Sequence, residues 1–176
     1  LDHLHIALIG DLRYGRTVHS LLKLSTLFKD ITFTLISPKR LQIPDELRSF
    51  LTTNHVSFIE TDAMESGIAN ADVLYVTRVQ KERFPNEEDY AAVSGSYVLT
   101  KEIFHTHSKK EAIILHPLPR VDELSTDLDD LPNSQYFAQS DHGLYVRMAL
   151  FLQILGRDEL LRPYITQDNI TMDTRS

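Results

Sequence analysis

Short apolar segments alternate with amphipathic segments along most of the chain. Runs rich in β-branched residues predict buried β-strands at 4–10, 31–37, 56–59, 73–76 and 112–115. Apolar residues at helical spacing predict helices at 15–28, 44–53 and 63–69, with further helical stretches before residue 112. Strands that alternate with helices in this way form a parallel sheet. The pattern therefore predicts an α/β fold, in which an open, doubly wound, Rossmann-like parallel sheet carries helices on both faces.

The C-terminal part of the chain has a different pattern. Residues 117–133 form a long segment punctuated by prolines and acidic residues, and long loops inside compact domains are usually functional. A final helix is predicted at about 134–155, with Gly156 as its natural stop. Its apolar residues are Tyr136, Phe137, Leu144, Tyr145, Met148, Leu150, Phe151 and Leu155. We expect one domain at 1–156 and an increasingly polar tail at 157–176, of which the last dozen residues are loosely held.

Composition narrows the class of protein. With 176 residues, 42% of them hydrophobic, the chain is long enough to bury a core of its own. The absence of cysteine excludes disulfides, a thiolate nucleophile and a Cys-ligated metal, and it suits a reducing compartment. Without a membrane-spanning run or a signal pattern, the sequence predicts a cytoplasmic protein. A net charge of −7 argues against nucleic-acid binding, so an anion site here must be local.

Open parallel sheets bind ligands at the carboxyl ends of their strands, and the first predicted strand ends in a glycine-containing turn. Gly10 and Gly15 permit a tight turn, and Arg16 with Thr17 falls at a helix N-terminus, where N–H groups and the helix dipole favour an anion. The glycine spacing matches neither the dinucleotide fingerprint nor the phosphate loop. An ordinary turn with a solvated arginine is the alternative interpretation of this segment.

Two later strand ends also carry candidate chemistry. In an extended segment Arg78 and Gln80 point the same way, which places a carboxylate clamp beside a neutral amide. This arrangement suits a small carboxylic acid, although a solvated charged loop would have the same residues. In the segment His116-Pro117-Leu118-Pro119-Arg120, two prolines bracket Leu118, restrict its backbone and can present its carbonyl to a ligand.

Metal and nucleophile chemistry find no support in the sequence. A lone histidine such as His116 is usually a structural group, and the eight histidines show no paired spacing for a metal. No serine or aspartate lies in a nucleophile-elbow context. Two arginine anion sites and one stiff carbonyl therefore point to catalysis by positioning.

Four segments resemble the aspartate carbamoyltransferase family, and in particular its C-terminal, aspartate-binding half. They are GDLRYGRTVHS at 10–20, DVLYVTRVQKERF at 72–84, HPLPRVDEL at 116–124 and GLYVRMAL at 143–150. They occur in the order of the family, and the resemblance runs from about Leu4 to Leu155. The segments TRVQ and HPLPR favour aspartate over ornithine. The resemblance implies transfer of a carbamoyl group from carbamoyl phosphate to L-aspartate in pyrimidine synthesis, without a cofactor.

The resemblance also implies roles for individual residues. Arg16 and Arg78 would hold the two carboxylates of L-aspartate, and Gln80 would assist them. The Leu118 carbonyl and Pro119 would contact the carbamoyl group and the amine, with a cis bond between the two residues. Glu82 and Arg83 would make domain-closing ion pairs, and Tyr90 with Asp122 would tie a loop to the proline segment. The other supporting residues are Thr17, His116 and Pro117.

The sequence departs from the family in two ways. Ala138 stands where a basic residue is common, and the segment 140–143 also differs, which we interpret as variation on a helix face. The carbamoyl-phosphate half of the family has no counterpart in these residues. We therefore expect a piece of a longer protein that is inactive alone, binds carbamoyl phosphate through the missing N-terminal domain and packs its last helix toward it.

The family implies a homotrimer for the intact enzyme, which can be a stand-alone protein or part of a multifunctional chain. Two other functions stay open at this point. One is a non-catalytic amino-acid-binding or regulatory module, and the other is a transcarbamoylase for another amino acid such as ornithine.

Overall fold

A computed structural model describes residues 2–79, 84, 86–91, 95, 97–157 and 159–160. The chain divides into two units, Leu1–Phe137 and Ala138–Ser176, which we describe separately. The predicted domain boundary after residue 156 stays a prediction. Among the described residues, no helix is long and apolar enough to cross a membrane.

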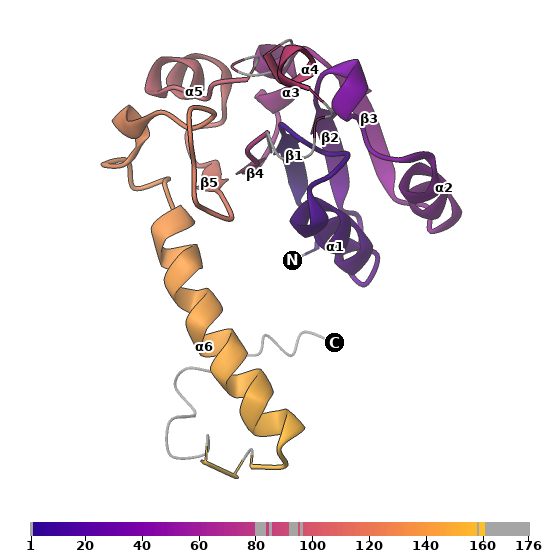
Figure 1. The fold of residues 1–176 in the computed structure, drawn as a ribbon, viewed down its shortest axis with the longest axis vertical. Helices are drawn as coiled ribbons and strands as arrows, with labels where there is room; N and C mark the ends of the chain where they lie inside the picture. The colour runs from indigo at the N-terminus through magenta and orange to yellow at the C-terminus, as the bar shows by residue number, and fades with distance from the viewer. Residues whose placement is uncertain are drawn as a thin grey trace. The chain divides into compact units, whose positions relative to one another are not determined.

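The first unit is built on one parallel sheet of five strands in the order β3-β2-β1-β4-β5 (Figure 1). The strands are β1 (His5–Ile9), β2 (Thr32–Ile36), β3 (Ser57–Thr61), β4 (Val73–Val76) and β5 (Ile113–Leu115). All five predicted strands are confirmed, as is the open parallel sheet. Ile9 pairs with Ile36 on one side and with Val76 on the other, so the carboxyl ends of β1, β2 and β4 lie level. The loops that leave these strands therefore begin side by side.

Helices cover both faces of this sheet, as predicted. The α-helices of the first unit are α1 (Arg16–Ser25), α2 (Asp45–Thr53), α3 (Met64–Ile68), α4 (Glu87–Ala91) and α5 (Lys101–His107), and short 3-10 helices lie at Lys39–Leu41 and Thr126–Leu128. Leu8 belongs to the buried cluster that includes α1 and α2, whereas its neighbour Ile9 belongs to the cluster that includes α3 and α5. Successive residues of a strand point to opposite faces, which produces the two cores.

The structure corrects two details of the predicted elements. Helix α1 ends at Ser25, not near residue 28, because the hydroxyls of Ser25 and Thr26 donate to the carbonyls of Leu22 and Lys23 at the helix end. Leu27, which completed the predicted apolar face, is 76% exposed. The long segment at 117–133 is also less irregular than predicted, since it contains the 3-10 turn Thr126–Leu128 and pairs with Leu99 through a β-bridge at its residue 124.

Helix α6 (Tyr136–Ile154) begins in the first unit and makes up most of the described second unit. Its extent agrees with the prediction, and Gly156 follows it with a φ of +63°. Beyond Phe137 the helix is apolar around much of its circumference, yet these side chains are exposed. The large ones are Leu144, Tyr145, Val146, Met148, Leu150, Phe151 and Ile154, and Leu155 follows the helix end. Such a helix is typically buried against another part of a protein.

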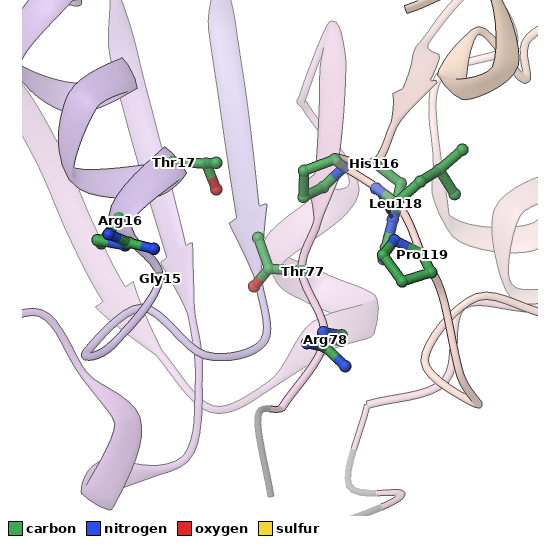
Figure 2. Close-up of a pocket in the computed structure, with 9 residues that line it drawn as sticks. Gly15, Arg16, Thr17, Thr77, Arg78, His116, Leu118 and Pro119 are labelled. Atoms are coloured by element: carbon green, nitrogen blue, oxygen red, sulfur yellow. Dashed lines mark hydrogen bonds between the residues drawn. The ribbon is translucent and has the colours of Figure 1, made fainter. Parts of the chain in front are cut away.

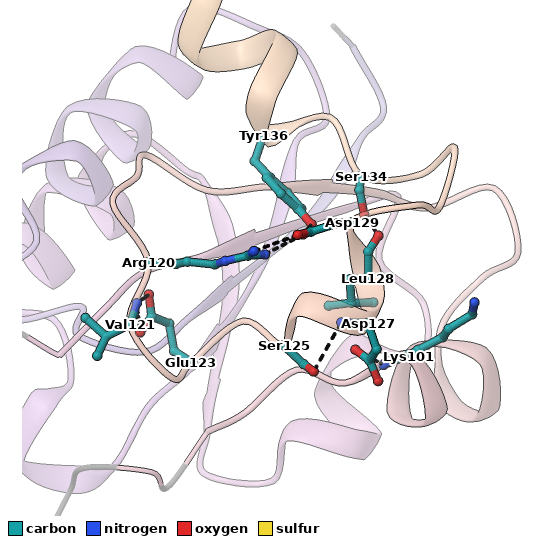
Figure 3. Close-up of polar contacts among 10 residues, drawn as sticks. All are labelled: Lys101, Arg120, Val121, Glu123, Ser125, Asp127, Leu128, Asp129, Ser134 and Tyr136. Carbon is teal, nitrogen blue, oxygen red and sulfur yellow. Dashed lines mark hydrogen bonds and ion pairs between the residues drawn. The ribbon is translucent and has the colours of Figure 1, made fainter.

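The first turn of α6 is fixed by a polar cluster within the first unit (Figure 3). The fully buried Tyr136 donates its hydroxyl to Asp129, and both terminal guanidinium nitrogens of Arg120 donate to the same carboxylate. The hydrogen bonds from Arg120 have the largest effect on the pKa of the Asp129 carboxyl, and together with the one from Tyr136 they hold this pKa below its ordinary value. The cluster therefore joins the segment after the two prolines to the start of α6.

We expect Tyr136→Phe to lower the free energy of unfolding of the protein by about 1.5 kcal/mol, because it removes a partly buried hydrogen bond to a charged acceptor and leaves the ring in place. Tyr145→Phe is the matched control, since Tyr145 is 64% exposed. It should change the free energy of unfolding by less than about 0.5 kcal/mol. Urea denaturation measures both, and equal stabilities of the two variants would contradict the prediction.

Candidate functional site

The turn after β1 is closed by hydrogen bonds to Asp11 and contains two positions that only glycine fits. The buried Asp11 accepts hydrogen bonds from the backbone N–H groups of Arg13 and Tyr14, at 3.1 and 2.9 Å. Gly10 has a φ of +112°, and a Cβ at this position would lie 2.2 Å from the Thr77 carbonyl oxygen. A Cβ on Gly15 would lie 2.5 Å from the Asp11 carbonyl oxygen. Glycine is needed at both positions because the backbone segments approach too closely for a side chain.

This turn delivers the start of α1 to a pocket of about 230 Å³ at the carboxyl edge of the sheet (Figure 2). Three segments that are far apart in the sequence line it. They are Gly15, Arg16 and Thr17 before and in α1, Thr77 and Arg78 after β4, and His116, Pro117, Leu118 and Pro119 after β5. The structure thus brings together the three strand ends that the sequence singled out.

The pocket has the charge of an anion site. Its lining includes two arginines from separate segments, Arg16 at the start of α1 and Arg78 after β4, and among the described residues no Asp or Glu lines it. The first turn of α1 also contains no acidic residue. Its N-terminus therefore adds exposed N–H groups and a positive dipole end, both of which favour a negative charge.

Thr77 and Gly15 are pocket residues that the sequence analysis did not propose as ligand-contacting. The Thr77 side chain donates to the Ile9 carbonyl at 3.1 Å, and its backbone N–H donates to the same oxygen at 2.8 Å. Thr77 therefore fixes the end of β4 against the end of β1. Thr77 directly follows the predicted strand at 73–76, and this position is the feature of the sequence that indicates a pocket residue.

The proline segment carries a cis bond between Leu118 and Pro119, as the family resemblance implied, and Leu118 has a φ of +48°. Beneath it, His116 is 1% exposed and Glu123 is 5% exposed. The Leu118 N–H donates to Nδ1 of His116 at 2.8 Å, and Nε2 of the same ring lies 2.7 Å from Oε1 of Glu123. Both ring nitrogens are therefore engaged in contacts within the loop.

The remaining proposed residues follow β4 and the proline segment in the chain. Gln80, Glu82 and Arg83 lie outside the described residues. Tyr90 lies in α4 with its ring 5.7 Å from that of Phe84, which in turn lies 6.4 Å from the Tyr14 ring in the turn after β1. Asp122 is exposed, and its pairing with Tyr90 stays a prediction. Within the described ranges, no three His, Asp or Glu side chains lie close enough to share a metal ion.

Comparisons with known sequences agree with this geometry. A family model described as the Asp/Orn binding domain of aspartate/ornithine carbamoyltransferase matches residues 2–154. The aspartate carbamoyltransferase catalytic subunit of Alkaliphilus oremlandii is 48% identical over 93% of this chain and 49% of its own length. The chain spans about half the length of the curated relatives it matches.

Solved structures give the same result. The catalytic subunit of M. jannaschii aspartate transcarbamoylase matches with a TM-score of 0.80 and 43% identity, over 88% of this chain and 51% of that one. Aspartate transcarbamoylase from Trypanosoma cruzi, solved in complex with carbamoyl phosphate, matches with a TM-score of 0.76 and 39% identity, over 85% of this chain and 50% of that one. The resemblance seen in the sequence is thereby confirmed. The chain belongs to the aspartate/ornithine carbamoyltransferase family and comprises its Asp/Orn-binding domain.

Proposed function

We propose that this chain is the L-aspartate-binding half of an aspartate carbamoyltransferase. The observation that carries the proposal is the pair of arginines, Arg16 and Arg78, that reach one small pocket from two separate strand ends. Two guanidinium groups suit a ligand with two carboxylates, because each can bind one carboxylate through two hydrogen bonds. L-Ornithine carries a side-chain ammonium in place of the second carboxylate, so an arginine pair disfavours it.

In the proposed reaction the neutral amine of aspartate attacks the carbamoyl carbon, the bond from this carbon to the phosphate oxygen breaks, and one proton of the amine passes to the departing phosphate. Arg16 and Arg78, with Gln80, would hold the dicarboxylate so that its amine faces the carbamoyl group. Leu118 and Pro119 would contact the reacting groups from the opposite wall. Positioning of two reactants supplies on the order of 7 to 11 kcal/mol, and developing charge is stabilised by fixed donors.

The proposal requires a second half that binds carbamoyl phosphate. The exposed apolar side chains of α6 are the surface on which we expect that half to pack, since a helix with this composition is rarely left in water. We use the term assembled enzyme for this chain together with such a half, and we infer from the family that it is a cytoplasmic homotrimer.

Calorimetric titration tests which amino acid the site takes. We expect the assembled enzyme, saturated with carbamoyl phosphate, to bind succinate, a dicarboxylate that lacks the reactive amine. L-Asparagine, an amide analogue in which one carboxylate of aspartate is missing, should bind about 10- to 100-fold more weakly than succinate, because one charge-assisted interaction is lost. L-Ornithine should show no heat of binding. Tighter binding of ornithine than of succinate would reject the proposal, and carbamoyl transfer to aspartate in the same preparation would support it directly.

A further inference from the structure

We propose that His116 is a positioning residue for this reaction, in that its ring fixes the Leu118 peptide at the pocket wall while Glu123 fixes the ring. The inference rests on the proposed function, because it concerns the same site. It differs from the role that a histidine at a reaction site commonly has, which is to accept or donate a proton.

The hydrogen bonds determine which ring nitrogen carries the proton. The Leu118 backbone N–H can only donate, so Nδ1 of His116, 2.8 Å away, must be the acceptor and is unprotonated. The proton of the neutral ring is then on Nε2, from which it is donated to the Glu123 carboxylate at 2.7 Å. A proton added at Nδ1 would face the Leu118 N–H. The ring therefore serves as a fixed link between two parts of the loop.

The Glu123 end of this link is anchored in the fold. Val121 N–H lies 3.3 Å from both carboxylate oxygens of Glu123. The Glu123 carbonyl accepts from Leu99 N–H at 2.9 Å, and Ser125 N–H donates to the Leu99 carbonyl at 3.0 Å, which forms the β-bridge described above. A continuous series of contacts thus runs from this bridge through Glu123 and His116 to the Leu118 peptide.

Burial makes these contacts difficult to replace. Both side chains are almost completely excluded from solvent, so water cannot take over a lost hydrogen bond at low cost. Burial by itself raises the pKa of the Glu123 carboxyl, but the hydrogen bonds from His116 and the backbone outweigh it, and the pKa lies below its ordinary value. The carboxylate is therefore charged at neutral pH, and it accepts the hydrogen bond from Nε2 of His116.

Two substitutions separate the two ends of the ring. In His116→Asn the amide oxygen takes the place of Nδ1 and can accept from Leu118 N–H, but nothing reaches Glu123. In His116→Gln the amide nitrogen takes the place of Nε2 and can donate to Glu123, but Leu118 N–H loses its acceptor. The first variant keeps the contact to the Leu118 peptide, and the second keeps the contact to the buried carboxylate.

We expect activity and stability to rank in opposite orders in the assembled enzyme. His116→Gln should be the more stable variant toward urea, yet its kcat at saturating aspartate should fall about 100-fold, the size of effect that a small misplacement of a reacting group produces. His116→Asn should be less stable but keep the higher kcat. Carbamoyl-phosphate affinity of the folded variants, measured by calorimetry, should change less than kcat.

The outcomes distinguish the inference from the function on which it rests. If the unsubstituted assembled enzyme transfers no carbamoyl group to aspartate, the proposed function fails. If that enzyme is active and kcat follows stability, with His116→Gln the more active variant, His116 has only a structural role and the inference is overturned. Should His116→Asn not fold, His116→Gln decides alone, because a wild-type kcat in that variant would reject the positioning role.

Discussion

Arg78→Ala is expected to reduce carbamoyl transfer by the assembled enzyme by about 10²- to 10³-fold, the cost of leaving a bound charge without its hydrogen-bonded partner. Binding of carbamoyl phosphate should stay close to that of the unsubstituted enzyme, because the TRVQ segment serves the second substrate alone in our proposal. The loss should appear in the response to aspartate, so the rate is measured over a range of aspartate concentrations.

Arg40→Ala is a suitable control for this experiment. Arg40 is an exposed arginine in the 3-10 turn after β2, and it does not line the pocket. Its removal changes the net charge by the same amount and should leave the rate nearly unchanged. An equal loss of affinity for both substrates in Arg78→Ala would show that this arginine supports the structure of the site and does not bind aspartate.

Gly10→Ala is expected to destabilise the protein by about 3 kcal/mol or more, as the sum of backbone strain and overpacking. The backbone there has a φ of +112°, and the added methyl group would lie 2.2 Å from the Thr77 carbonyl oxygen. That oxygen belongs to the main chain and cannot rotate away as a flexible side chain would. The carboxyl ends of β1 and β4 must separate, and the walls of the pocket separate with them. Urea denaturation and succinate titration measure the two consequences.

Gly143→Ala gives the matched comparison within a helix. A Cβ at Gly143 would meet only the guanidinium nitrogens of Arg147, at 3.7 and 3.9 Å, and these can move. Alanine also favours the helical backbone by about 1 kcal/mol over glycine. We therefore expect unchanged or greater helix content by circular dichroism. A Gly10→Ala protein as stable as Gly143→Ala would contradict the close approach of the two strand ends.

The turns at the two glycines and the segment with two prolines show how several parts of the molecule depend on one another. Gly10 lets β1 and β4 end side by side, and this places Arg16 and Arg78 at one pocket. His116 and Glu123 hold the third wall from within the loop. In the proposed function, the two arginines can bind one dicarboxylate because the main chain places both of them at this pocket.

The sequence alone determined the fold class and the regions that form the pocket. Buried parallel strands are apolar throughout and helices are amphipathic, so the order of elements followed from hydrophobic periodicity. Ligands bind at the carboxyl ends of such strands, and the residues there could be read directly from the chain. The family resemblance added roles for Arg16, Arg78 and Leu118 that no periodicity contains.

Only the tertiary structure decided what depends on contacts between distant residues. Leu27 has the spacing of a core residue, yet it is exposed, because periodicity does not show where a helix stops. The pairing of His116 with Glu123, the approach of Gly10 to Thr77 and the clamp of Arg120 on Asp129 all depend on how loops fold back. A sequence pattern records which face of an element is apolar, but it does not record the loop path that brings two polar groups within hydrogen-bond distance.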